Sequence, residues 1–145
     1  MTEMKNLIFF AVSFIFLISY SYGESEPSAS VIEGEDFEFS FEGVEKAIGV
    51  KRLLLGRGAP EGWQFYYLCE KSKGDNKKKC GKWVDEKGNK VNNGNKVTVK
   101  GIHAIISNIS VEDGGRYTAI VEDSKDEVNG LRLYVGPKPP PPPKY

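Results

Sequence analysis

The run Asp113-Gly114-Gly115-Arg116-Tyr117 constrains the fold of this chain more than any other stretch. It joins two segments with strand character, 102–109 and 116–122, through an acidic residue and two glycines, which are typical of turns. Short apolar stretches alternate with Gly- and Asn-rich turns in the same way throughout 31–135. This pattern predicts an all-β domain, with no helix after residue 23.

The motif and the strand before it resemble the end of strand E, the corner and the start of strand F in immunoglobulin domains. The likeness is specific over 102–119 and looser over the rest of 31–135. It implies an immunoglobulin-like Greek-key β-sandwich of seven to nine strands that acts by binding. It also implies a structural corner, in which Asp113 ties the turn, Gly115 permits it and the Tyr117 hydroxyl bonds to upstream backbone.

The amino-terminal segment has the pattern of a secretory signal peptide. Lys5 precedes an apolar stretch over 7–20, and Ser21-Tyr22-Gly23 offers small residues to a signal peptidase. A membrane-spanning helix needs about 20 apolar residues, so a signal is favoured over an uncleaved anchor. We therefore expect residues 1–23 to be removed, the protein to be secreted and extracellular, and no stable insertion into a membrane.

The remaining chain divides into three parts. Residues 24–30 are a polar lead-in, and 31–135 form the immunoglobulin-like domain. Residues 136–145 contain six prolines in ten positions and cannot pack a core, so they are expected to form a disordered, proline-rich tail.

Strand assignments follow from the alternation of apolar and polar residues. The three phenylalanines of 37–41 alternate with polar residues and predict strand B. In strand E, Ile102, Ala104 and Ile106 are expected to face the core. The other outer assignments are 96–100 for strand D, 116–122 for strand F and 128–135 for strand G.

The segment between strands B and D allows two registers. In the first, 50–55, 63–69 and 80–84 are strands C, C′ and C″ of a variable-type sandwich, and Leu54 takes the place of the usual core tryptophan. In the second, 50–60 is a long loop and Trp63 is that tryptophan. The first is preferred because it needs no structureless loop of about twenty residues.

Cysteine placement departs from the family. Immunoglobulin domains usually join strands B and F by a disulfide, but Phe41 and Ala119 occupy the matching positions here, and together they could fill the space. The two cysteines present, Cys69 and Cys80, favour a disulfide across one short loop of a secreted protein. Such a loop would be stabilised by about 2–3 kcal/mol.

By analogy with the family, a partner protein is recognised through the sheet face or the end loops. Tyr66 and Leu68 are expected to point away from the core if Phe65 and Tyr67 point inward. The other candidate binding residues are Lys77, Lys78 and Lys79 in the lysine-rich loop and Ser124, Lys125 and Asp126 in the turn before strand G. The expected partner is an extracellular or cell-surface protein.

Two other modes of binding remain open. The lysine-rich loop between the cysteines could contact an anionic glycan of the extracellular matrix. A small apolar ligand could occupy the space between the sheets, since the usual disulfide is missing there. Binding to nucleic acid is poorly supported, because the net charge is +0 at pH 7 and the chain is expected to be exported.

Catalytic groups are sparse. His103 is the single histidine, expected on the outward side of a strand, and no Gly-x-Ser-x-Gly motif occurs. Neither a metal site nor a cofactor is expected, because cysteine and histidine ligands are too few. These features predict a protein that is not an enzyme.

Asn108-Ile109-Ser110 is the one Asn-x-Ser/Thr sequence in the chain. It lies where strand E is expected to end in an exposed turn, and Asn108 is therefore a candidate glycosylation site.

Overall fold

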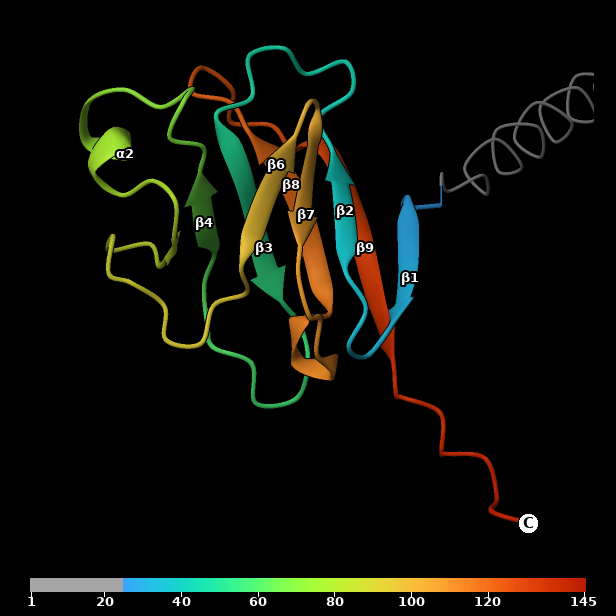
Figure 1. The fold of residues 1–145 in the computed structure, drawn as a ribbon. Coiled ribbons are helices and arrows are strands. Elements are labelled where there is room, and N and C mark those ends of the chain that lie inside the picture. Colours follow the sequence, from blue (N-terminus) through green and yellow to red (C-terminus); the bar gives the residue numbers. More distant parts are fainter. Residues whose placement is uncertain (1–24) are drawn as a thin grey trace, which may run out of the picture.

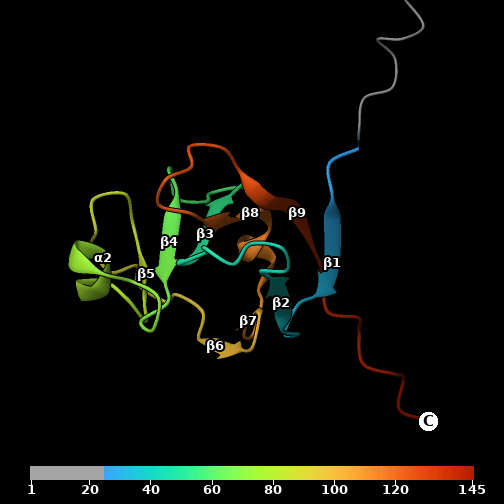
Figure 2. The ribbon, with the colours of Figure 1, turned by 90° about the horizontal axis from the view of Figure 1, so that it is seen from above.

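A computed structural model describes residues 25–145, which form two packed β-sheets (Figures 1 and 2). The larger sheet has six strands and the smaller has three. In chain order the strands are β1 (Ser28–Ile32), β2 (Phe37–Ser40), β3 (Gly49–Leu54), β4 (Gln64–Tyr67), β5 (Trp83–Val84), β6 (Val97–Lys100), β7 (His103–Ile106), β8 (Gly115–Ile120) and β9 (Val128–Gly136). A short helix, α2 (Gly74–Lys78), and a 3₁₀ turn, η1 (Val111–Asp113), complete the elements.

The strand order is that of a variable-type immunoglobulin sandwich. The large sheet runs β1-β9-β8-β3-β4-β5 and the small sheet runs β2-β7-β6. In family terms these orders are A′-G-F-C-C′-C″ and B-E-D. The predicted fold class is therefore confirmed, and so is the register in which the three middle segments are C, C′ and C″.

The ends of the domain differ slightly from the prediction. β1 begins at Ser28, inside the segment expected to be a lead-in, and it pairs in parallel with β9. Residues 137–145 form no helix or strand and lead away from the sandwich (Figure 1). The predicted signal peptide lies outside the described residues. Within those residues, no helix is long and apolar enough to cross a membrane.

Aromatic side chains fill the space between the two sheets. The ring centres of Phe37 and Tyr117 lie 5.1 Å apart in an edge-on contact, and Phe39 meets Phe41 in the same manner at 5.4 Å. Phe41 and Ala119, at the positions of the missing disulfide, are both buried in this core. They lie in one cluster of apolar side chains, as expected for residues that replace the cross-link.

Two details of the core differ from expectation. Ile102 was expected to face inward, but it is 51% exposed because it lies in the turn before β7 rather than in the strand. Leu54 is buried at the end of β3, whereas the middle of that strand places Val50 and Arg52 in the interior. The aromatic ring that packs beside this strand belongs to Trp83, which is 2% exposed.

The Asp113–Tyr117 motif forms the predicted corner. The Tyr117 hydroxyl donates a hydrogen bond of 2.6 Å to the Asp113 carbonyl oxygen. The Asp113 carboxylate accepts hydrogen bonds from the Ser110 backbone N–H and hydroxyl at 2.8 and 3.1 Å. Gly115 is required for a different reason from the one expected: a Cβ there would lie 2.1 Å from the Leu53 carbonyl oxygen. The close approach of β3 to β8, rather than the turn, excludes a side chain.

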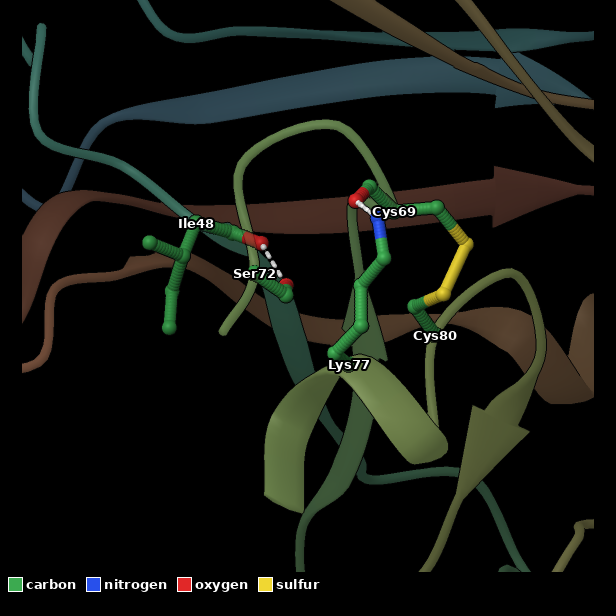
Figure 3. Close-up of a disulfide and its surroundings, with 5 residues drawn as sticks. All are labelled: Ile48, Cys69, Ser72, Lys77 and Cys80. Atoms are coloured by element: carbon green, nitrogen blue, oxygen red, sulfur yellow. Dashed lines mark hydrogen bonds between the residues drawn. A yellow bond between two sulfur atoms is a disulfide. The ribbon is translucent and has the colours of Figure 1, made fainter. Parts of the chain in front are cut away.

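The two cysteines form the predicted disulfide. Cys69 and Cys80 follow and precede the antiparallel strands β4 and β5, with their Cα atoms 5.0 Å apart. The enclosed loop contains α2, contrary to the expectation that no helix follows the signal (Figure 3). Ser72, in the same loop, is buried and its hydroxyl lies 3.5 Å from the Ile48 carbonyl oxygen.

Candidate binding face

The predicted orientation of strand β4 is wrong. Tyr66 and Leu68 were expected to face solvent, but they are 9% and 7% exposed and belong to the core. The pairing of β4 with β3 explains this result, because Tyr66 lies opposite Val50, which is fully buried. Opposite residues share a face of the sheet. Phe65 and Tyr67 consequently lie on the outer face.

The outer face of β4 carries a group of aromatic rings and cations. Phe65 and Tyr67 are stacked, with ring centres 6.1 Å apart and an angle of 6° between planes. The Lys79 ammonium group lies 5.6 Å from the centre of the Tyr67 ring, and the Lys51 ammonium group lies 4.9 Å from that of Trp63. All five side chains are partly exposed. We call this group, Lys51, Trp63, Phe65, Tyr67 and Lys79, the aromatic face.

One cation elsewhere on this sheet is already paired. Arg116, on β8, bonds to Glu26 at 3.0 Å and to Glu127 at 2.6 Å. By contrast, Lys51 and Lys79 make no ion pair within residues 25–145. The aromatic face therefore carries a net positive charge beside apolar rings.

The three consecutive lysines of the cysteine loop do not form one cluster. The Lys77 ammonium group donates to the Cys69 carbonyl oxygen (Figure 3). Lys78 lies 3.6 Å from Asp75, one turn away on α2. Lys79 turns toward Tyr67. Only Lys79 joins the aromatic face, because the helix points its consecutive side chains in different directions.

The remaining predicted binding residues lie at the end of the sandwich that carries the β2–β3, β4–β5, β6–β7 and β8–β9 connections, which we call the loop-bearing end. The turn of Ser124, Lys125 and Asp126 connects β8 to β9, and the Asp126 backbone N–H donates to the Ser124 hydroxyl at 3.2 Å. This hydrogen bond shapes the turn but does not bring it to the aromatic face.

Asn108, the candidate glycosylation site, lies in the connection after β7, with an exposed side chain and a φ of 53°.

A buried polar cluster, which the sequence did not predict, lies behind the aromatic face. The Arg52 guanidinium donates to Gln64 at 2.9 Å and to Asn95 at 2.8 Å, and lies 3.4 Å from the Asp113 carboxylate. It also lies 3.4 Å from the Tyr117 hydroxyl. Burial raises the pKa of Tyr117 to about 12, while Arg52 opposes this shift. Every polar side chain of the cluster has a hydrogen-bond partner within it, so no bound ligand is needed to satisfy these groups.

His103 and the acidic pair Asp85 and Glu86 have structural contacts. The His103 Nδ1 lies 2.8 Å from the Glu38 carboxylate on the outer side of the small sheet. Asp85 accepts hydrogen bonds from the backbone of its own turn. Glu86 accepts one from the Trp63 backbone N–H at 3.1 Å. Within residues 25–145, no three His, Cys, Asp or Glu side chains gather in a way that could bind a metal.

No protein-family model and no curated protein matches the chain at a significant level. Similar solved structures include a marsupial T cell receptor, with 17% identity over 75% of this chain and 48% of that chain, and a TM-score of 0.42. They also include the novel immune-type receptor 10 extracellular fragment from Ictalurus punctatus, with 18% identity, coverage of 77% and 99%, and a TM-score of 0.44.

A third similar structure contains the extracellular domains of the voltage-gated sodium channel beta4 subunit, with 13% identity, coverage of 80% and 97%, and a TM-score of 0.37. The chain spans about half the length of the T cell receptor chain that it matches. The strand order and the tyrosine corner of this chain define its fold.

Proposed function

We propose that this protein is a secreted, non-catalytic recognition module that binds an extracellular or cell-surface protein through the aromatic face. The observation that carries this proposal is the stacked pair Phe65 and Tyr67 on the solvent side of β4. The core of the domain does not include these rings. Aromatic residues are enriched at protein interfaces, where they give large contact areas at low entropic cost.

The charge of the aromatic face favours an acidic partner. Lys51 and Lys79 lie over ring faces, with their ammonium groups positioned by the strand and by the cysteine loop. Complementary charge raises the association rate and selects among partners. A partner with an apolar patch bordered by carboxylates would match both properties of this surface.

Two features support a function outside the cell. The amino-terminal sequence has the pattern of a secretory signal. The Cys69–Cys80 disulfide is of the kind that persists in oxidising compartments. This disulfide also closes the loop that positions Lys79 beside Tyr67. The geometry of the aromatic face therefore depends on an oxidising compartment.

The proposal can be tested by secreting the full chain from animal cells, multimerising it and screening it against extracellular proteins. We expect a partner whose binding is lost in the double variant Phe65→Thr, Tyr67→Thr. The matched control is His103→Thr, Ile105→Thr, which changes two outward residues on β7 of the opposite sheet. Equal loss in both variants, or loss in neither, would contradict recognition through the aromatic face.

A further inference from the structure

A hollow opens between the two sheets at the loop-bearing end, on the side away from the aromatic face. We propose that it binds a small amphiphilic amine, with an apolar body inside the hollow and a protonated amine at its rim. The cavity has a volume of about 690 Å³. Pockets for small ligands commonly have volumes of about 300–1,000 Å³. This site goes beyond the proposed function and shares no residue with the aromatic face.

The hollow exists because the two sheets have unequal widths. The small sheet ends at β6, whereas β4 and β5 of the large sheet continue beyond that edge (Figure 2). At the loop-bearing end, the inner side of β4 is therefore not covered by a facing strand. The connection between β2 and β3 and the turn between β6 and β7 form the other walls.

The walls of the hollow are apolar. Phe41, Val44 and Leu68 are buried core residues that also line it. Val99 and Ile102 lie at its outer edge, where they are 46% and 51% exposed. Exposed aliphatic side chains beside a cavity leave apolar surface in water, and a ligand that covered them would be stabilised by removing that surface.

The inner wall offers one polar group. The Tyr66 ring lines the hollow, and its hydroxyl makes no hydrogen bond to the described part of the chain. Burial raises the pKa of Tyr66, so the hydroxyl remains protonated at neutral pH. It could bond to a polar atom on the body of the ligand.

The charge at the rim selects the ligand's head group. Three carboxylates border the hollow, those of Glu42, Glu45 and Glu70, and the one cation among its lining residues is Lys71. None of the three glutamates makes an ion pair within residues 25–145. The lining residues therefore carry a net negative charge, which favours a cationic head over a neutral or anionic one.

The test compares three probes with the same alkyl chain: decylamine, decanol and decanoate. Each is titrated into the isotope-labelled protein, and amide and methyl NMR shifts are followed. We expect shifts at hollow residues such as Val44, Leu68 and Ile102, with decylamine binding at least about tenfold more tightly than decanoate. Added salt should reduce this preference, because the rim charges are exposed.

Two variants separate the apolar part of the site from the charged part. Val99→Trp, at an exposed edge position, should fill the hollow and remove binding of all three probes while the domain stays folded. The triple variant Glu42→Gln, Glu45→Gln, Glu70→Gln should keep decanol binding and lose the preference for decylamine. Its matched control changes three exposed glutamates outside the hollow, Glu61→Gln, Glu112→Gln and Glu122→Gln, and should keep that preference.

Several results would overturn this proposal. The amine assignment is wrong if decanoate binds as tightly as decylamine or if the triple variant keeps the preference. The small-ligand assignment is wrong if no probe shifts the hollow residues. If Val99→Trp instead abolishes binding of a partner protein that Phe65→Thr, Tyr67→Thr leaves intact, the hollow receives a protein side chain. That outcome would contradict both the small-ligand proposal and the proposed function.

Discussion

The Arg52 guanidinium carbon lies 4.1 Å from the centre of the Trp83 ring, so a buried charge packs on an aromatic face inside the sandwich. Both residues also bond to Asn95, which precedes β6: Arg52 donates to its side chain at 2.8 Å and the Trp83 indole N–H to its carbonyl at 3.0 Å. Asn95 in turn donates to the Asp113 carboxylate at 3.0 Å. The cluster thus connects the large sheet to the residues that lead into β6 of the small sheet.

Loss of the arginine should destabilise the domain strongly. Arg52→Ala would leave the Asp113 carboxylate buried without its cation, and removing one partner of a buried pair costs about 3–5 kcal/mol. Arg52→Lys should recover only part of this, because an ammonium group cannot reproduce the forked contacts with Gln64 and Asn95. Urea unfolding measures the loss. Lys51→Ala, at the neighbouring outward position, is the control, and a similar cost for Lys51→Ala and Arg52→Ala would contradict this account.

Alkaline unfolding should depend on Tyr117. Its folded pKa is about 12, against 10.0 for the ordinary phenol, so the unfolded chain loses this proton first as the pH rises. Titration of Tyr117 leaves the free energy of unfolding unchanged below about pH 10 and lowers it by on the order of 2 kcal/mol between about pH 10 and 12. Tyr117→Phe should lower stability at neutral pH by about 1–3 kcal/mol, because the Asp113 carbonyl loses its donor.

The same variant should show a smaller loss of stability between neutral and alkaline pH than the parent protein. Urea unfolding at about pH 8 and about pH 11.5 provides the comparison, and tyrosinate absorbance reports the titration. Other groups titrate in both proteins, so the difference between them isolates Tyr117. An equal alkaline loss in the two proteins would show that this phenol is not held neutral in the fold.

The two adjacent glycines of the corner should respond differently to alanine. A Cβ at Gly115 would lie 2.1 Å from the Leu53 carbonyl oxygen, so Gly115→Ala must separate β3 from β8. Overpacking of this kind costs about 1–3 kcal/mol or more. At Gly114 the nearest atom would be 3.4 Å away and φ is −64°, so Gly114→Ala should be tolerated. Denaturant midpoints measure the loss of stability in the two variants. A larger loss for Gly114→Ala than for Gly115→Ala would contradict this prediction.

Removal of the disulfide should loosen one hairpin and leave the core intact. The variant Cys69→Ser, Cys80→Ser is expected to lose about 2–3 kcal/mol, since the loop is short. Hydrogen exchange should accelerate over 68–84 and stay slow in β2, β7 and β8, which form the interior away from this loop. Faster exchange throughout the domain would indicate that the disulfide supports the whole sandwich.

Asn108 should carry a glycan when the full chain is secreted from animal cells. Its side chain is exposed, and its φ of 53° lies in the left-handed region that asparagine tolerates. Asn108→Asp keeps a residue suited to this backbone and should remove the added mass, as measured by mass spectrometry before and after enzymatic deglycosylation. Identical masses for the two proteins, beyond the amide-to-acid difference, would contradict glycosylation at this position.

Much of the fold was predictable because its signals are local. The corner at Asp113 and Tyr117 identifies the turn into strand F within five residues, and the preference for short connections favours the observed C, C′ and C″ strands. The cysteine pairing also followed from the chain, since Cys69 and Cys80 had no alternative intramolecular partners.

The orientation of β4 was not predictable, because the signal there is ambiguous. The four consecutive apolar residues 65–68 do not alternate with polar ones, so they do not indicate which side faces the core. The polar Gln64 would be expected to face solvent, but it is buried on the same side of the strand as Tyr66. Gln64 faces inward because Arg52 is buried opposite it. A buried arginine contradicts the usual preference of charged residues for the surface, and the sequence therefore predicts the wrong side of the strand for Tyr66 and Leu68.

The parallel pairing of β1 with β9 has a mechanical consequence. Ser28 lies opposite Arg132 and Ile32 opposite Gly136, and the chain enters β1 at one end of the sandwich and leaves β9 at the other (Figure 1). Tension between these two ends would slide the strands past each other, straining all their hydrogen bonds together rather than opening them in succession. Resistance to such a pull is governed by the unfolding barrier. The domain therefore carries a shear clamp, whose strength depends on the five residues of β1.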